Sequence, residues 1–212
     1  MDKLIEDALK NLGIEVLNPM QKAAIAASKE KKDMILLSPT GTGKTLAFLL
    51  PLLQELKPDN NTVQCMILVP SRELALQIDS VFNAMNTGFR TCCCYGGHSS
   101  AEEKKTILNT HSAIIIGTPG RITDHLSKGV IDPETIRILI IDEFDKSLEF
   151  GFHDEMAEII SQLPNLEKRV LLSATDSGEI PEFTGLGRTV KLNFLDGEAK
   201  SERLKLMKVV SQ

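Results

Sequence analysis

Short apolar, β-branched runs alternate with longer amphipathic stretches along most of the chain. The runs are apolar throughout rather than at every second position, which is typical of strands covered on both faces. They predict strands at residues 33–37, 65–69, 90–95, 113–117, 137–141, 168–172 and 189–194. The stretches between them predict helices at residues 20–31, 44–56, 72–85, 101–109, 122–126 and 152–163.

This alternation of strands and helices predicts an α/β fold with a doubly wound, mostly parallel sheet flanked by helices. Ligands of such sheets bind beyond the carboxyl ends of the strands. At 212 residues the chain has the length of one domain, which we expect to span residues 1–198. Residues 199–212 carry four basic side chains and are expected to begin a linker.

Composition narrows the class of protein. Hydrophobic residues make up 42% of the chain and charged residues 25%, as in soluble globular proteins. No apolar run approaches the roughly 18 residues that a membrane span needs. The N-terminus has no basic region followed by an apolar run, so no secretion signal is predicted. We therefore expect a cytoplasmic, monomeric protein.

Charge and the metal-binding residue types bear on possible partners. The net charge of −5 argues mildly against nucleic acid. Backbone amides and helix N-termini can nevertheless bind phosphate without adding formal charge. The consecutive cysteines 92–94 would alternate between two faces of a strand, which makes a poor metal site. The four histidines, His98, His111, His125 and His153, show no ligand spacing and are predicted at surface or loop positions.

The most specific local pattern is Ser-Pro-Thr-Gly-Thr-Gly-Lys-Thr at residues 38–45, after a predicted strand and before a predicted helix. Glycines let several backbone N–H groups point at one anion, and the helix dipole adds positive charge there. The pattern predicts a site for a nucleoside triphosphate and Mg²⁺, with Lys44 on the β- and γ-phosphates and the Thr45 hydroxyl on the metal. Ser38 stands where the strict pattern has glycine. The residues expected to hold the nucleotide are Thr40, Gly41, Thr42, Gly43, Lys44 and Thr45.

Carboxylates follow the predicted strand at 137–141. Asp142 is expected to hold Mg²⁺ through a water, and Glu143 to orient or deprotonate the attacking water. Lys44, Asp142 and Glu143 are therefore the predicted catalytic residues. An acidic cluster alone would be read as a solvated turn, but the loop at residues 38–45 and the position of the cluster at a strand end together favour function.

Seven segments in a fixed order resemble the first RecA-like domain of a DEAD-box RNA helicase. They are residues 13–21 (the Q motif), 38–45 (motif I), 70–75 (motif Ia), 96–97 (paired glycines), 118–121 (motif Ib), 142–145 (motif II) and 173–175 (motif III). The resemblance implies a RecA-like P-loop NTPase domain with ATP and Mg²⁺ as cofactors and RNA as partner.

The resemblance also implies roles for individual residues. Gln21 would read the edge of adenine. Ser173 and Thr175 would couple nucleotide to RNA through hydrogen bonds to Asp145. Contacts to RNA phosphate and ribose would be independent of base sequence. They would come from Arg72, Gly96, Gly97, Thr118, Gly120 and Arg121.

Three departures from the family pattern stand out. Phe144 occupies the third position of motif II, where the family has alanine. Leu4 occupies the position of an aromatic residue that stacks on adenine, which weakens the prediction of adenine preference. Residues 176–188 are rich in glycine where the family usually continues with a helix.

The family also has a second RecA-like domain, whose arginines complete the active site. Because residues after 190 leave no room for it, we expect the chain to be part of a longer protein and to hydrolyse ATP very slowly alone. Arginine fingers contribute roughly three to five powers of ten in rate. Two alternatives remain open: a DNA helicase or translocase domain, and a nucleotide-gated RNA clamp without hydrolysis, against which Glu143 argues.

Overall fold

The computed structural model describes residues 3–196 except residues 31, 59, 98 and 177. The predicted domain end at residue 198 and the linker at 199–212 lie outside the described residues. Within these ranges, no helix is both long enough and apolar enough to cross a membrane.

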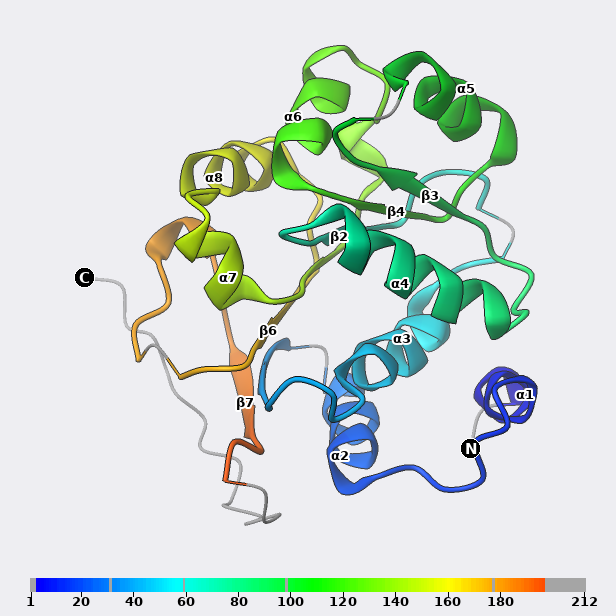
Figure 1. The fold of residues 1–212 in the computed structure, drawn as a ribbon, viewed down its shortest axis with the longest axis vertical. Coiled ribbons are helices and arrows are strands. Elements are labelled where there is room, and N and C mark those ends of the chain that lie inside the picture. The colour runs from blue at the N-terminus through cyan, green and yellow to red at the C-terminus, as the bar shows by residue number, and fades with distance from the viewer. Residues whose placement is uncertain (1–2, 31, 59, 98, 177, 197–212) are drawn as a thin grey trace.

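The centre of the molecule is a seven-stranded sheet in which all paired strands are parallel (Figure 1). The strand order across the sheet is β3-β4-β2-β5-β6-β1-β7. All seven predicted strands are confirmed, with ends shifted by at most one residue. Their bounds are β1 Asp33–Leu37, β2 Cys65–Leu68, β3 Thr91–Cys94, β4 Ile114–Gly117, β5 Ile138–Ile141, β6 Lys168–Ser173 and β7 Thr189–Asn193.

Helices cover both faces of the sheet, as the predicted doubly wound fold requires. Their bounds are α1 Lys3–Asn11, α2 Pro19–Ser28, α3 Lys44–Glu55, α4 Arg72–Ala84, α5 Ser100–Thr110, α6 Pro119–Ser127, α7 Phe144–Glu149 and α8 His153–Ser161, with 3-10 turns η1 Pro133–Thr135 and η2 Glu182–Thr184. One core lies between the sheet and α1–α4, and the second between the sheet and α5–α8. Figure 1 shows the first group at the lower right and the second at the top and left.

Alternation along the strands divides the apolar residues between these two cores. In β1, Met34 and Leu36 pack toward α1–α4, whereas Ile35 packs toward α5–α8. Successive side chains of a strand point to opposite faces, so an apolar run supplies both cores at once. This explains why the strands read as continuous apolar runs.

Two helices were not predicted from the sequence. Helix α1 buries Ile5, Ala8 and Leu9, whose spacing is amphipathic. Helix α7 begins directly after Asp142 and Glu143, which we call the acidic pair, and buries Phe144, which is only 2% exposed. The larger side chain at this departure from the family pattern thus fills the core beside α8 rather than the candidate site.

One predicted histidine position is wrong. His125 is completely buried, because it lies on the same side of α6 as the buried Ile122 and Leu126. His111 and His153 are exposed, as predicted, and His98 lies outside the described residues. The four cysteines are unpaired; Cys65, Cys92 and Cys94 are buried, and burial raises the pKa of Cys93 to about 12.

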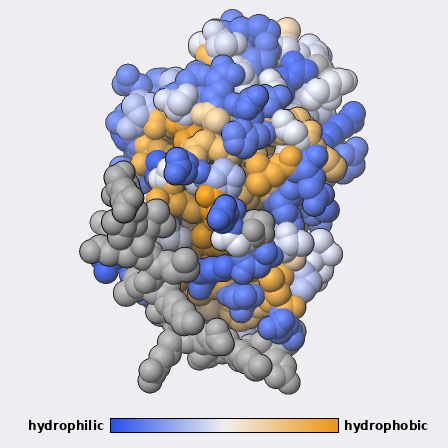
Figure 2. All heavy atoms as spheres, turned by 90° about the vertical axis from the view of Figure 1, so that its left-hand side faces the viewer, coloured by the Kyte–Doolittle hydropathy of each residue, from blue (hydrophilic) through white to orange (hydrophobic). Residues whose placement is uncertain are grey.

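The side of the molecule formed by α7, α8 and η2 exposes apolar atoms between hydrophilic ones (Figure 2). Phe150, at the end of α7, is 59% exposed. The rings of Phe150 and Phe152 form a T-shaped pair with their centroids 6.5 Å apart. Residues 176–188 contain η2 as their only helical turn among the described positions, which agrees with the predicted departure from a helix.

Asp33, at the start of β1, connects this strand to β6 and to the segment before β7. Its two carboxylate oxygens accept hydrogen bonds from the N–H groups of Arg169 and Gly187, each at 2.7 Å. Because Asp33→Ala leaves both donors without this acceptor, we expect a loss of about 1–3 kcal/mol in unfolding free energy. Asp33→Asn keeps one oxygen and should lie between the two proteins in urea denaturation. A change below about 0.5 kcal/mol for Asp33→Ala would contradict this account.

Candidate functional site

Six of the seven predicted site segments lie at one edge of the sheet, where the parallel strands end. Three neighbouring strands, β5, β6 and β1, lead into the acidic pair, residues 173–175 and loop 38–45. We call this the lysine half. The other three neighbours, β3, β4 and β2, lead into residues 95–97, 118–121 and 70–72, which form the arginine half.

Loop 38–45 is tightly folded around the ammonium group of Lys44. Lys44 is in the first turn of α3, and its Nζ donates to the carbonyl oxygens of Ser38 at 2.5 Å and Pro39 at 3.1 Å. Gly41 and Gly43 have φ angles of +78° and +89°, which other residues rarely adopt. The hydroxyls of Ser38 and Thr42 lie 2.7 Å apart, so the serine in place of glycine takes part in the loop.

The Q-motif segment packs directly against this loop. Gln21 is buried: its Oε1 accepts from the N–H of Asn18 at 3.0 Å and its Nε2 donates to the Gly43 carbonyl at 3.3 Å. Asn18 caps α2 and donates from Nδ2 to the Thr42 carbonyl at 2.9 Å. Gln21 therefore joins the cap of α2 to the loop, and both ends of its amide are engaged.

In the lysine half, Lys44 and nearby carboxylates influence each other's pKa values. Burial raises the pKa of Asp142 to about 6, although the Glu143 N–H, at 2.9 Å from Oδ1, and the charge of Lys44 act in the opposite direction. Burial likewise lowers the pKa of Lys44, and the carboxylates of Asp142, Asp145 and Glu143 partly offset it. These residues therefore lie within electrostatic reach of one another.

Glu143 has an unusual backbone conformation for its residue type. Its φ angle is +49°, in the left-handed region that costs about 1–2 kcal/mol for a residue with a side chain. Its carboxylate pairs with Lys146 Nζ at 2.9 Å. The sharp turn at the end of β5 thus holds the Glu143 side chain outside the core, where it is 19% exposed.

Residues 173–175 reach the last carboxylate of the acidic segment through one of the two predicted side chains. The Thr175 hydroxyl donates to Asp145 Oδ2 at 3.0 Å, and the Ala174 N–H donates to the same oxygen at 3.2 Å. Ser173 instead donates to the carbonyl oxygen of Thr175 at 2.7 Å. Its hydroxyl shapes the turn that presents Thr175.

In the arginine half, the only tyrosine of the chain lies between the two predicted arginines. The guanidinium of Arg72, an exposed residue, lies over the Tyr95 ring at 4.9 Å from its centroid. Arg121 donates from Nε to the Tyr95 carbonyl at 3.2 Å, and its side chain is 15% exposed. Gly96, Gly97 and Gly120 are exposed. Thr118 is half-buried at the start of α6 and has its N–H on the Cys94 carbonyl.

The chemistry of the lysine half suits a magnesium nucleotide. An ammonium group and loop N–H groups at a helix N-terminus bind phosphate, and the hydroxyl of Thr45 and carboxylate of Asp142 are the hard oxygen ligands that Mg²⁺ prefers. Burial of Asp142 is only partly compensated by Lys44 and the Glu143 N–H, so a cation beside it would be stabilising.

Three residues that contribute to the site were not singled out from the sequence. Asn18 had a readable signal, because Asn followed three residues later by Gln is a capping pattern. Tyr95 precedes the paired glycines but has no pattern of its own. Glu103 lies in α5 and reaches Tyr95 only through the fold, with Oε1 accepting from the Tyr95 N–H at 3.1 Å.

Comparisons with a family model, with curated proteins and with solved structures all point to the same family. A family model described as DEAD/DEAH box helicase matches residues 18–183. The chain is 36% identical over 186 residues to DEAD-box ATP-dependent RNA helicase 9, mitochondrial, of Arabidopsis thaliana, covering 85% of this chain and 30% of that protein. It is 37% identical over 177 residues to DEAD-box ATP-dependent RNA helicase RhpA of Helicobacter pylori, covering 81% of this chain and 36% of that protein.

A solved structure described as a DEAD box protein from the hyperthermophile Methanococcus jannaschii superposes with a TM-score of 0.82 at 26% identity. The match covers 91% of this chain and 54% of that one. The chain spans about a third of the length of the two curated relatives.

The two loop glycines allow a matched test of the contact between loop 38–45 and Gln21. A Cβ on Gly43 would lie 2.8 Å from Gln21 Nε2, whereas a Cβ on Gly41 would meet no atom within 4 Å. Both substitutions to alanine carry the cost of a positive φ, but Gly43→Ala should lose a further amount of about 0.5–1.5 kcal/mol, because the Gln21 amide must move and give up its hydrogen bond to the Gly43 carbonyl. Urea denaturation measures both.

The same comparison in a Gln21→Ala background provides the control. The difference between the two alanine variants should shrink there, because the clashing group is absent. Equal stability of the two variants in the wild-type background would contradict the close packing of Gln21 on the loop.

Proposed function

This chain belongs to the DEAD/DEAH box helicase family, and we propose that it is the N-terminal, RecA-like domain of an ATP-dependent RNA helicase that unwinds short RNA duplexes or remodels RNA–protein complexes. The lysine half would bind ATP with Mg²⁺. The arginine half would bind the backbone of single-stranded RNA. Full hydrolysis would need a second RecA-like domain.

One observation carries the nucleotide part of the proposal. Lys44 lies within the electrostatic influence of Asp142, Asp145 and Glu143. The loop, the acidic pair and the Thr175 turn follow three neighbouring strands, β1, β5 and β6. Lys44 and the N–H groups of residues 40–45 would bind the phosphates, and Thr45 and Asp142 would hold Mg²⁺. Bound Mg²⁺ supplies positive charge to the phosphate oxygens.

The roles of the remaining residues follow from their contacts. Glu143, directed away from the core by its backbone, would accept a proton from the attacking water. Gln21, which bonds the loop at Gly43, would exchange these amide contacts for the edge of adenine, and Leu4 would cover the ring without aromatic stacking. Thr175 on Asp145 would connect the acidic pair to the turn after β6.

The RNA part rests on polar groups at the ends of β2, β3 and β4. Arg72 presents a guanidinium group at the surface. The exposed glycines at 96, 97 and 120 allow an RNA strand to approach the protein backbone closely. Such contacts involve phosphate and ribose, so they operate despite the overall negative charge of the chain.

Nucleotide binding is tested with a fluorescent ATP analogue in the presence of Mg²⁺. Lys44→Ala should weaken its affinity at least about tenfold, because a charged hydrogen-bond donor contributes about 1.5–3 kcal/mol. Lys22→Ala, at an exposed position of α2, is the matched control for the charge change and should bind as the wild type does. Equal affinities for all three proteins would refute the proposed site.

Turnover by this chain alone is expected to remain close to background, with or without single-stranded RNA. Roughly three to five powers of ten in rate would come from arginines outside this chain. A phosphate-release assay with Glu143→Gln as reference separates residual hydrolysis at this site from contamination, because only the former disappears in the variant. Robust RNA-stimulated turnover by these 212 residues would overturn the need for a second domain.

A further inference from the structure

A buried carboxylate at the base of the arginine half has no role in the function proposed above. Glu103 is 3% exposed although it lies near the start of α5, and it faces the end of β3. A buried carboxylate is tolerated only when its oxygens are hydrogen-bonded and its charge is paired. The partners that satisfy Glu103 therefore indicate what it does.

Both oxygens of Glu103 act on the segment that follows β3. Oε1 accepts the N–H of Tyr95 at 3.1 Å. Oε2 lies 3.5 Å from Nε of Arg121, and the same Nε donates to the carbonyl oxygen of Tyr95 at 3.2 Å. One carboxylate thus restrains Tyr95 on both sides, directly at its N–H and through Arg121 at its carbonyl.

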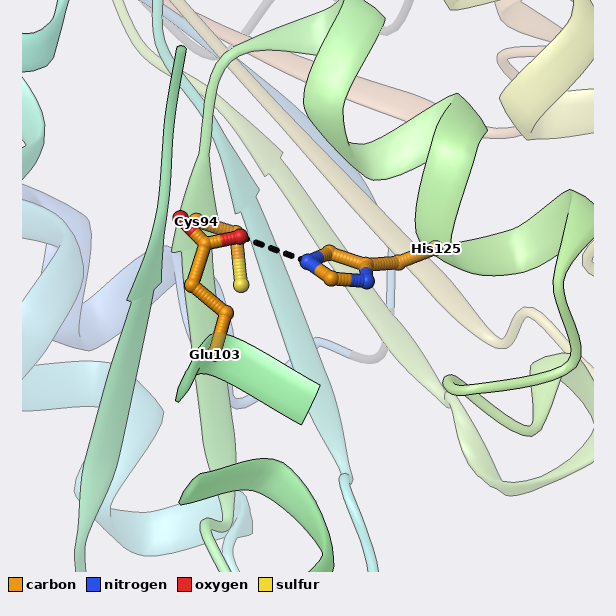
Figure 3. A group of neighbouring side chains, drawn as sticks. All are labelled: Cys94, Glu103 and His125. Carbon is orange, nitrogen blue, oxygen red and sulfur yellow. Dashed lines mark hydrogen bonds and ion pairs between the residues drawn. The ribbon is translucent and has the colours of Figure 1, made fainter. Parts of the chain in front are cut away.

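The third partner of Glu103 comes from α6. His125, completely buried, approaches Oε2 with Nε2 at 2.6 Å (Figure 3). The Nδ1 atom of His125 has no hydrogen-bond partner within the described part of the chain. His125 is therefore connected to the polar groups of this region through Glu103, and it fixes the side chain of Glu103 between α5 and α6.

The restrained residue lies at the centre of the proposed RNA interface. The ring of Tyr95 lies under the guanidinium of Arg72, and the next two residues are the exposed glycines 96 and 97. A shift of the Tyr95 peptide would move the ring, the arginine on it and the glycine turn together.

We propose that Glu103 is a positioning residue of the RNA interface, which fixes the Tyr95 peptide, and with it Arg72 and the glycine turn, by a carboxylate held in place by His125 and Arg121. The inference rests on the proposed RNA binding. It assigns roles to Glu103, Tyr95 and His125 that are separate from contact with RNA itself.

Glu103 and His125, together with Cys94, also offer the donor set of a metal site, since their ligand atoms lie within 4.8 Å of one another. Two observations favour the hydrogen-bonded network over a metal. The guanidinium of Arg121 would repel a cation at Glu103 Oε2. A hydrogen bond with Cys92 and burial both raise the pKa of the Cys94 thiol, which opposes the thiolate form that binds zinc.

Tyrosine fluorescence gives a direct readout of this network. The chain contains one tyrosine and no tryptophan, so its intrinsic emission comes from Tyr95, which is 8% exposed. Glu103→Ala should make the emission clearly more accessible to acrylamide quenching. Glu103→Gln retains an acceptor for the Tyr95 N–H and should stay close to the wild type. Glu158→Ala, at an exposed position of α8, is the control for the charge change and should have no effect.

Binding of a labelled oligouridine and of the fluorescent ATP analogue completes the experiment. Glu103→Ala should weaken RNA affinity about tenfold, which corresponds to about 1.4 kcal/mol, and leave nucleotide affinity within twofold. Glu103→Gln should recover most of the RNA affinity. A residue that only maintained the fold would lower both affinities together.

The possible failures are distinguishable. Unchanged quenching in Glu103→Ala, or RNA affinity equal to the wild type, overturns the role of Glu103. Loss of both affinities in Glu103→Ala and Glu103→Gln assigns it to the fold alone. Increased quenching without any RNA binding by the wild type refutes the proposed RNA interface instead. Stoichiometric zinc binding by the wild type, with a chelator reproducing the Glu103→Ala quenching, replaces the network by a metal site.

Discussion

Parallel pairing of all seven strands puts every strand-to-helix connection at one edge of the sheet. Each strand must be covered on both faces, which the alternate side chains achieve by packing into two cores. The central strands β4, β2 and β5 carry no charged side chain, and the polar groups of the site collect where the strands end. The site residues consequently follow six neighbouring strands, from β3 to β1 in the strand order, rather than lying within one loop. Neighbouring strands of a sheet lie about 4.8 Å apart.

Each half of the site contains buried charged groups, and each half compensates for their burial in its own way. In the lysine half, burial shifts the pKa values of both Lys44 and Asp142, and their opposite charges offset these shifts only in part, so the pair suits a charged ligand. In the arginine half, Glu103 is satisfied within the protein by Tyr95, Arg121 and His125. The first arrangement is suited to binding, and the second to holding a backbone in place.

The sequence predicted the strands well because continuous apolar runs have few alternative explanations in a chain of this composition. It also indicated that loop 38–45 and the acidic pair follow strands, whereas the order of the site segments came from the family resemblance. Helix α7 was missed because six residues are too few for a helical period to appear. Helix α1 was missed although its apolar spacing was readable.

Contacts between segments far apart in the chain could not be predicted from the sequence. The burial of His125 and the role of Glu103 depend on α5 and α6 meeting beside β3, and no local pattern encodes that meeting. The same holds for Gln21, whose amide bonds Gly43 in a loop 22 residues away. The residue type at such a position indicates which bonds are possible, but the fold decides which partner is within reach.

The two halves are joined by backbone hydrogen bonds at the base of the site. The N–H of Asp142 donates to the carbonyl of Leu68, that of Val69 to Gly117, and that of Thr118 to Cys94, at 3.0, 3.0 and 3.1 Å. This row runs from β5 through β2 and β4 to β3, directly beneath the acidic pair, Arg72 and Tyr95. A displacement of the Asp142 backbone would therefore strain the first bond of a row that ends at the Tyr95 peptide, which is where Glu103 provides a second restraint.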